Sequence, residues 1–61
     1  MKTSEFIRQL KKQGIKFLEH GSNHDWYINP DNGKVAQLGR HGTQDIKKGT
    51  MNQILKDLGL K

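Results

Sequence analysis

The sequence has no cysteine, a single proline and no long hydrophobic run among its 61 residues. Without cysteine there is no disulfide framework, no thiolate zinc site and no catalytic thiol. No apolar stretch approaches the length of a membrane span or of a signal-peptide core. We therefore expect a soluble cytoplasmic protein that does not enter a membrane.

Hydrophobic residues make up only 31% of the chain. A chain this short forms one domain at most, and its single core is close to the smallest that is sufficient for stability. We expect one domain over residues 1–61, stabilised by packing alone and further by a partner when one is bound.

Positive charge is in excess. Eleven Lys and Arg face six Asp and Glu, which gives a net charge of +5 and an isoelectric point near 9.8. So much positive charge on a small surface favours a polyanionic ligand, nucleic acid first and an acidic protein second. The alternative is that the charge serves only solubility, because it is moderate and not clustered in one run.

The N-terminal segment has the pattern of an amphipathic helix over residues 4–13. Thr3 or Ser4 is the expected cap, Glu5 suits the positive end of the helix dipole, and Gly14 is expected to end the helix. The apolar side is formed by Phe6, Ile7 and Leu10.

A second helix is predicted near the C-terminus. Thr50 and Gln53 have the spacing of a capping box, and Gly59 is expected to stop the helix so that Leu60 packs back on Leu55. Its apolar positions recur at helical intervals, at Met51, Ile54, Leu55 and Leu58.

Between the helices, alternating and aromatic residues predict a three-stranded meander. The expected strands cover residues 15–19, 25–29 and 34–38, joined by turns at 20–23 and 30–33. The predicted fold is α+β, in the order α-β-β-β-α, with two helices on one face of a three-stranded antiparallel sheet. Double-stranded-RNA-binding domains share this order. Residues 39–49 form a polar loop that contains four basic candidates for phosphate contact, Arg40, His41, Lys47 and Lys48.

Three histidines carry most of the possible chemistry. His20 and His24 flank the first turn, and His41 lies in the basic loop. A His-x3-His spacing suits zinc on a helix, but Gly21 and its polar neighbours predict a turn, so we expect no metal site. Ser22 is close to His24 but lacks the strand–turn–helix setting of a serine nucleophile.

RNA cleavage requires little machinery from a small protein. The ribose 2′-hydroxyl is a nucleophile already placed beside the scissile phosphate. An imidazole, with an ordinary pKa of about 6.5, suits the proton transfer at neutral pH. Lysine, arginine and backbone amides of a turn can stabilise the charge on phosphate. His24 is then a candidate catalytic residue that needs no cofactor.

Other interpretations stay open from the residues alone. The residues are equally consistent with His24 as an ordinary hydrogen-bonded turn residue. The chain would then be a non-catalytic RNA-binding module or a domain that binds an acidic protein. Strand alternation places His24, Trp26 and Ile28 on one face, but it does not decide which face meets the helices.

The stretch Gly21-Ser22-Asn23-His24, followed by an aromatic strand, resembles the HicA family of toxins from bacterial toxin–antitoxin pairs. The similarity extends over nearly the whole chain through segments 2–6, 13–14, 45–50 and 54–60. The combined order and spacing of these segments carry the resemblance.

The resemblance implies a double-stranded-RNA-binding-like fold and a ribosome-independent cleavage of mRNA in the bacterial cytoplasm. It implies that His24 is the essential histidine, that Gly21 and Ser22 form the turn presenting it, and that a HicB-type antitoxin blocks the toxin. No metal or small-molecule cofactor is expected. One departure weakens the transfer of a role to His41: Leu38-Gly39-Arg40-His41 stands where relatives more typically have Val-Pro-x-His.

Overall fold

A computed structural model describes residues 1–39 and 42–61 of the chain. It confirms the α-β-β-β-α order and the antiparallel three-stranded sheet. The elements are α1 (Thr3–Lys12), β1 (Lys16–His20), β2 (His24–Asn29), β3 (Lys34–Gly39) and α2 (Lys48–Asp57). Within the described residues, no helix is long and apolar enough to cross a membrane.

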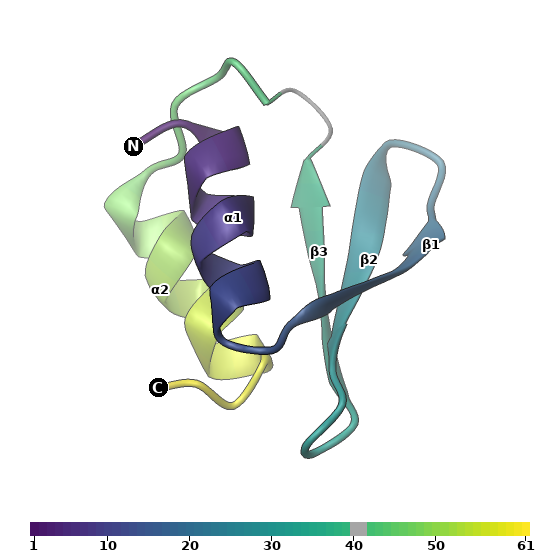
Figure 1. Cartoon of the computed structure of the whole chain (residues 1–61). Coiled ribbons are helices and arrows are strands. Elements are labelled where there is room, and N and C mark those ends of the chain that lie inside the picture. The colour runs from purple at the N-terminus through teal and green to yellow at the C-terminus, as the bar shows by residue number, and fades with distance from the viewer. Residues whose placement is uncertain (40–41) are drawn as a thin grey trace.

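The sheet has the order β1-β2-β3, and both helices lie on one side of it (Figure 1). The pairing of β1 with β2 is interrupted by a bulge between Phe17 and Glu19. The strand β1 lies farthest from the helices, and all five of its residues are exposed. The helices therefore cover β2 and β3 and leave β1 at an open edge.

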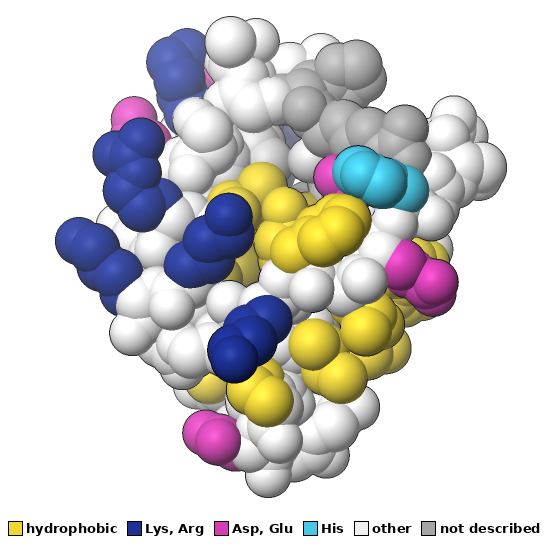
Figure 2. Space-filling model, turned by 45° about the vertical axis from the view of Figure 1, so that its right-hand side comes forward, with side chains coloured by type: hydrophobic (Ala, Val, Ile, Leu, Met, Phe, Trp, Pro, Cys, Tyr) yellow, Lys and Arg dark blue, Asp and Glu magenta, His cyan; other side chains and the backbone are white. Residues whose placement is uncertain are grey.

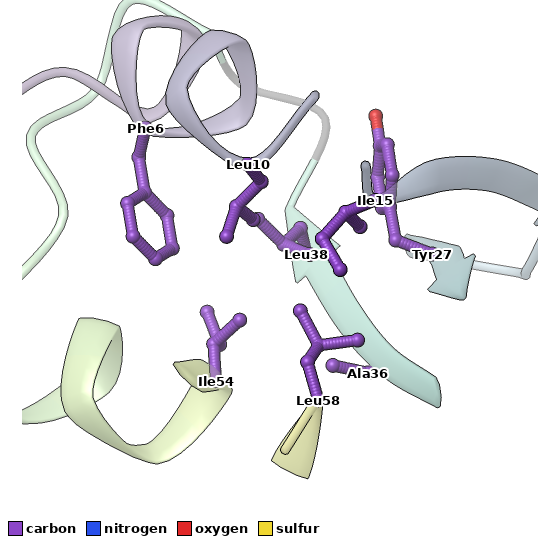
Figure 3. Packing of buried hydrophobic residues seen from close by; sticks show 8 residues of the cluster. All are labelled: Phe6, Leu10, Ile15, Tyr27, Ala36, Leu38, Ile54 and Leu58. Atoms are coloured by element: carbon purple, nitrogen blue, oxygen red, sulfur yellow. The ribbon is translucent and has the colours of Figure 1, made fainter. Parts of the chain in front are cut away.

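One hydrophobic core joins the helices to the sheet (Figure 3). Leu10 and Leu58 are fully buried, and burial of a side chain of this size contributes about 1.5–3 kcal/mol. The remaining core members are Phe6, Ile15, Tyr27, Ala36, Leu38 and Ile54. The predicted apolar sides of both helices are thus confirmed, with Ile7, Met51 and Leu55 packed at the margin.

Both helices end as predicted, at a glycine. Gly14 and Gly59 have positive φ values of 93° and 74°, a conformation that glycine adopts without steric cost. The following residue turns back in each case, since the Leu60 amide donates to the Leu55 carbonyl at 2.8 Å and Ile15 makes the equivalent bond in α1. Leu60 then packs against the core.

The predicted starts of the helices were wrong. The residue that precedes α1 is Lys2, and Thr3 lies inside the helix with its hydroxyl donating to the Gln44 carbonyl at 3.0 Å. The α2 helix begins at Lys48, so Thr50 is not its cap. Among the described residues, no side chain caps either helix. Contacts with the segment before α2 occupy the Thr3 hydroxyl, which a local capping rule does not anticipate.

Two asparagines attach the β2–β3 hairpin to the end of α2. The side-chain amides of Asn29 and Asn32 both donate to the Leu58 carbonyl, at 2.8 and 3.1 Å. Asn29 is buried, and its side-chain oxygen Oδ1 accepts a hydrogen bond from the Asp31 backbone amide at 3.1 Å. These bonds satisfy a carbonyl at the helix end that has no partner within the helix.

The strand faces, which the sequence left open, are resolved by burial and register. Tyr27 is buried and lies opposite Ala36, so this side of β2 meets the helices. Residues alternate along a strand, which places His24 and Trp26 on the other side. His24 therefore lies at the exposed start of the face that turns away from the core.

Candidate active site around His24

His24 is the first residue of β2, directly opposite Gly39 at the end of β3. A Cβ atom at Gly39 would lie 3.9 Å from the Cδ2 atom of the His24 ring. The imidazole therefore lies beside a position without a side chain. A Cβ atom at position 39 would make ordinary van der Waals contact with the ring, and glycine leaves this side of the imidazole uncovered.

The turn before His24 depends on a glycine. The Gly21 amide donates to the His24 carbonyl at 2.7 Å. A Cβ atom at Gly21 would come within 2.5 Å of the same oxygen, too close for any other residue without a backbone shift. Ser22 is exposed at the bend, and the described residues offer it no hydrogen bond. Gly21 thus sets the start of β2, and Ser22 remains accessible.

His24 borders a depression of about 460 Å³. The β-sheet side of this depression also includes Gln37 and Gly39, and Thr3 comes from α1. The opposite side consists of the segment before α2 and the first turns of that helix, through Asp45, Ile46, Lys47, Thr50 and Ile54. Segments that are far apart in the sequence therefore meet at this histidine.

The N-terminal end of α2 gives the depression a positive side. Lys47 precedes the helix, and the first turn contains no acidic residue. The first helical hydrogen bond runs from the Met51 amide to the Lys47 carbonyl, so the preceding amides have no acceptor within the helix. Such amides, together with the helix dipole, favour an anion such as phosphate.

The four basic residues predicted to contact phosphate differ in where they lie. Lys47 lines the depression with His24, whereas Lys48 is exposed on the first turn of α2 and is not part of the lining. Arg40 and His41 lie outside the described residues. Among residues 1–39 and 42–61, no three His, Cys, Asp or Glu side chains gather where they could hold a metal ion.

Sequence reasoning missed several residues of this depression. Thr50 was interpreted as a helix cap, but in the second half of the first turn it faces the same space as His24. Asp45 adds a carboxylate beside Lys47. Gln37 could have been found by the strand alternation of β3, because its neighbours Ala36 and Leu38 are the buried ones.

His20 has quite different surroundings. Its Nδ1 lies 2.8 Å from Asp25 Oδ1, and its ring packs edge-on against Phe17, with 4.9 Å between the ring centroids. Register places this group on the side of the sheet that also carries Tyr27. Burial raises the pKa of the Tyr27 phenol above its ordinary value, and the Asp25 carboxylate raises it further. The two hairpin histidines therefore belong to opposite faces.

Positive charge also lies away from the depression. Figure 2 shows Lys and Arg side chains along one side of a hydrophobic area, with a histidine and an acidic side chain at its other border. Three basic residues of α1, Arg8, Lys11 and Lys12, are exposed. These three exposed side chains are available for longer-range attraction of a polyanion.

The fold and the depression define a small α+β protein with the element order of double-stranded-RNA-binding domains and an exposed histidine beside a positive helix end. A family model described as "HicA toxin of bacterial toxin-antitoxin" matches residues 3–60. The chain belongs to the HicA toxin family.

Curated relatives match over the full chain. A probable mRNA interferase HicA from Pseudomonas fluorescens (strain Pf0-1) is 39% identical over 61 residues, covering 100% of this chain and 98% of the relative. A probable mRNA interferase toxin HicA from Escherichia coli (strain K12) is 40% identical over 60 residues, covering 98% of both. In the crystal structure of the E. coli HicAB toxin–antitoxin complex, one chain is 38% identical, with a TM-score of 0.86 over 98% of this chain and 100% of that one.

Proposed function

We propose that this chain is the toxin of a type II toxin–antitoxin pair and an endoribonuclease that cleaves mRNA without a metal ion and without the ribosome. One observation carries the catalytic part of the proposal: His24 is exposed at the edge of a depression whose opposite side is Lys47 and the N-terminal end of α2. Family membership and the names of the relatives support the substrate class.

The arrangement suits attack by the ribose 2′-hydroxyl on the adjacent phosphorus. The 2′-oxygen forms a bond to phosphorus as the bond to the 5′-oxygen breaks, leaving a 2′,3′-cyclic phosphate and a 5′-hydroxyl. One proton leaves the 2′-hydroxyl and one reaches the 5′-oxygen, and His24 transfers one of the two. Water transfers the other proton.

Lys47 and the free amides of the first turn of α2 supply the electrostatic part. Negative charge builds on the non-bridging phosphate oxygens during the reaction, and fixed N–H groups and an ammonium group stabilise it. Gly21 and Ser22 present the histidine, and Lys48, Arg40 and His41 are further proposed phosphate contacts. Of Lys47 and Lys48, which the structure describes, Lys47 lines the depression.

The test uses a labelled RNA in EDTA, with the native protein, His24→Ala and His20→Ala. His20→Ala is the matched control, since that histidine is paired with Asp25 on the other face of the sheet. We expect cleavage by the native protein and by His20→Ala, and a loss of about 100-fold or more in His24→Ala. A copy of the RNA with 2′-deoxy sugars should remain intact.

Three results would oppose the proposal. Normal cleavage by His24→Ala would remove the histidine from the reaction. RNA binding that falls steeply with salt, with no change of RNA length in any lane, would identify a non-catalytic RNA-binding module. Cleavage that disappears in EDTA and returns with a divalent cation would show that a metal takes part.

The proton carried by His24 can be assigned with a modified leaving group. A substrate with sulfur in place of the 5′-oxygen does not need protonation to leave. If His24→Ala cleaves this substrate as fast as the native protein does, His24 delivers the last proton. If the loss persists, His24 removes the first one.

The proposed partner is an antitoxin of the HicB type, since the solved structure that this chain resembles is a HicAB complex. An acidic partner surface over the depression would exclude phosphate and pair with Lys47. We expect the melting temperature to rise when the antitoxin is bound, by ordinary linkage. Equal melting temperatures with and without the purified antitoxin would contradict tight binding to the folded chain.

A further inference from the structure

A second depression, of about 330 Å³, adjoins the one at His24. Gln37, Thr50 and Ile54 line both, so the two form one groove between β3 and α2. The first ends at His24, and the second ends at Trp26 and Asp57. A ligand held at His24 therefore has a continuous path along the helix towards its C-terminal half.

Trp26 gives the second depression an aromatic wall. It lies two residues after His24 on the same face of β2, which corresponds to about 7 Å along the strand. Trp26 is half-buried and lies directly opposite Gln37 in the β2–β3 register. An indole at this distance from the reacting phosphate is within reach of a base on one of the nucleotides that flank it.

Two side-chain amides accompany the indole. Gln37 is exposed, and its amide makes no hydrogen bond to the part of the chain that the structure describes. Gln53 donates its Nε2 to Asp57 Oδ1 at 2.9 Å, which leaves the Gln53 carbonyl oxygen as an acceptor. A primary amide has both a donor and an acceptor, and can therefore pair with the edge of a base.

Charge divides the groove into two parts. The His24 end contains the Asp45 carboxylate together with Lys47 and the amides of the first turn of α2, and this ammonium group and these N–H groups favour phosphate there. Asp57 lies at the Trp26 end, whose described lining contains no Lys or Arg, so this carboxylate repels phosphate without an opposing cation. The second depression is thus suited to the uncharged part of a nucleotide.

We propose that the Trp26 depression is a nucleobase subsite, in which an unpaired base beside the scissile phosphate stacks on Trp26 and its edge is recognised by Gln37 and Gln53. This inference rests on the proposed function, because it takes the ligand to be the RNA that His24 cleaves. The base has to be unstacked from its own strand to enter, so the substrate is single-stranded at this point.

The first measurement uses Trp26 as its own reporter, because it is the only tryptophan in the chain. The His24→Ala variant is mixed with a short single-stranded RNA that carries an end label. Anisotropy of the label measures binding, and tryptophan fluorescence measures stacking. We expect quenching that follows the binding curve. Replacement of one nucleotide by an abasic residue should abolish the quenching at a single position of the RNA.

Variants separate recognition from folding. Trp26→Leu keeps an apolar side chain and should weaken RNA binding about 10-fold through the loss of stacking. Gln37→Ala changes an exposed residue and should alter the order of preference among RNAs that differ in the base beside the cleavage point. Gln9→Ala, at an exposed position of α1, is the matched control and should change neither. Circular dichroism of each variant checks that the fold is retained.

The outcomes distinguish this proposal from the one on which it rests. Cleavage by the native protein, with unquenched Trp26 or with a base preference unchanged in Gln37→Ala, overturns the base subsite and leaves the nuclease intact. Base-dependent quenching without any cleavage supports the subsite and overturns the nuclease. Quenching by purified antitoxin but not by RNA assigns the groove to the protein partner and overturns the subsite.

Discussion

The attachment of α2 to the hairpin allows a quantitative test of cooperation between two side chains. Asn29 and Asn32 donate to the same carbonyl, that of Leu58. In Asn29→Ala, two hydrogen bonds are lost, the one to Leu58 and the one from the Asp31 amide. At about 0.5–1.5 kcal/mol each, the expected loss of unfolding free energy is about 2 kcal/mol.

Asn32→Ala should cost less, about 1 kcal/mol, because its bonds are more exposed to water. In each single variant the Leu58 carbonyl keeps one donor. In the double variant it has none at the helix end, and an unsatisfied buried group costs about 1–3 kcal/mol more. We therefore expect the double variant to lose more stability than the sum of the two single variants.

The assay is urea unfolding followed by circular dichroism, with the four proteins of the double-mutant cycle. For a chain of this size, 1 kcal/mol corresponds to about 4–8 °C in melting temperature, so thermal melts give a second measurement. Asn52→Ala is the control, because Asn52 accepts only a surface bond from Lys61 and should change stability by less than about 0.5 kcal/mol. Additivity within about 0.5 kcal/mol would refute the reasoning, since it would mean that the carbonyl is satisfied without either asparagine.

Three further predictions concern single residues. Burial, and then the Asp25 carboxylate, raise the pKa of the Tyr27 phenol in the folded protein, so this phenol should stay neutral at a pH above its ordinary pKa. The stability that the neutral phenol contributes is therefore complete below the ordinary pKa and is lost as the pH rises through the raised pKa of the folded protein. Absorbance of the phenolate reports this residue alone, since it is the only tyrosine; an ordinary titration curve, or an unchanged alkaline stability profile in Tyr27→Phe, would contradict the expectation. Gly21→Ala should lower the unfolding free energy by more than about 1 kcal/mol and reduce cleavage with it, because the methyl group meets the His24 carbonyl. Gly49→Ala should instead stabilise the protein by up to about 1 kcal/mol, since the added Cβ atom meets no atom of the described residues within 4 Å and lies in a helix. Equal effects at the two glycines in urea unfolding would show that steric contact is not the cause.

The sequence was sufficient for the features that depend on local rules. Element order, the apolar sides of the helices and the glycine stops at Gly14 and Gly59 follow from periodicity and from the backbone freedom of glycine. The strands differed from the predicted ones by a residue or so at their ends. The first covers Lys16–His20, and its exposure shows that the helices do not extend over the edge of the sheet.

The rest depended on contacts between distant segments. Thr50 has the spacing of a capping residue, but α2 starts two residues earlier, and Thr50 instead lines the depression at His24. Thr3 bonds to Gln44, 41 residues away. Asn29 is buried, and its side-chain amide donates to the Leu58 carbonyl, 29 residues further along the chain. No local pattern marks such pairs, and for the same reason the sequence offered His24 and Lys47 as candidates but did not predict the depression that both of them line.

The depression at His24 can form only late in folding. Its lining comes from Thr3, from the middle of the chain and from residues 45–54, and none of these segments encloses the histidine alone. During synthesis, the α1 helix and the hairpin leave the ribosome first, with His24 already exposed but without the positive helix end that faces it. A nascent chain that has not yet folded residues 45–54 against the hairpin therefore lacks the proposed phosphate site. An antitoxin that binds the assembled depression, as proposed, would therefore capture folded molecules and not growing ones.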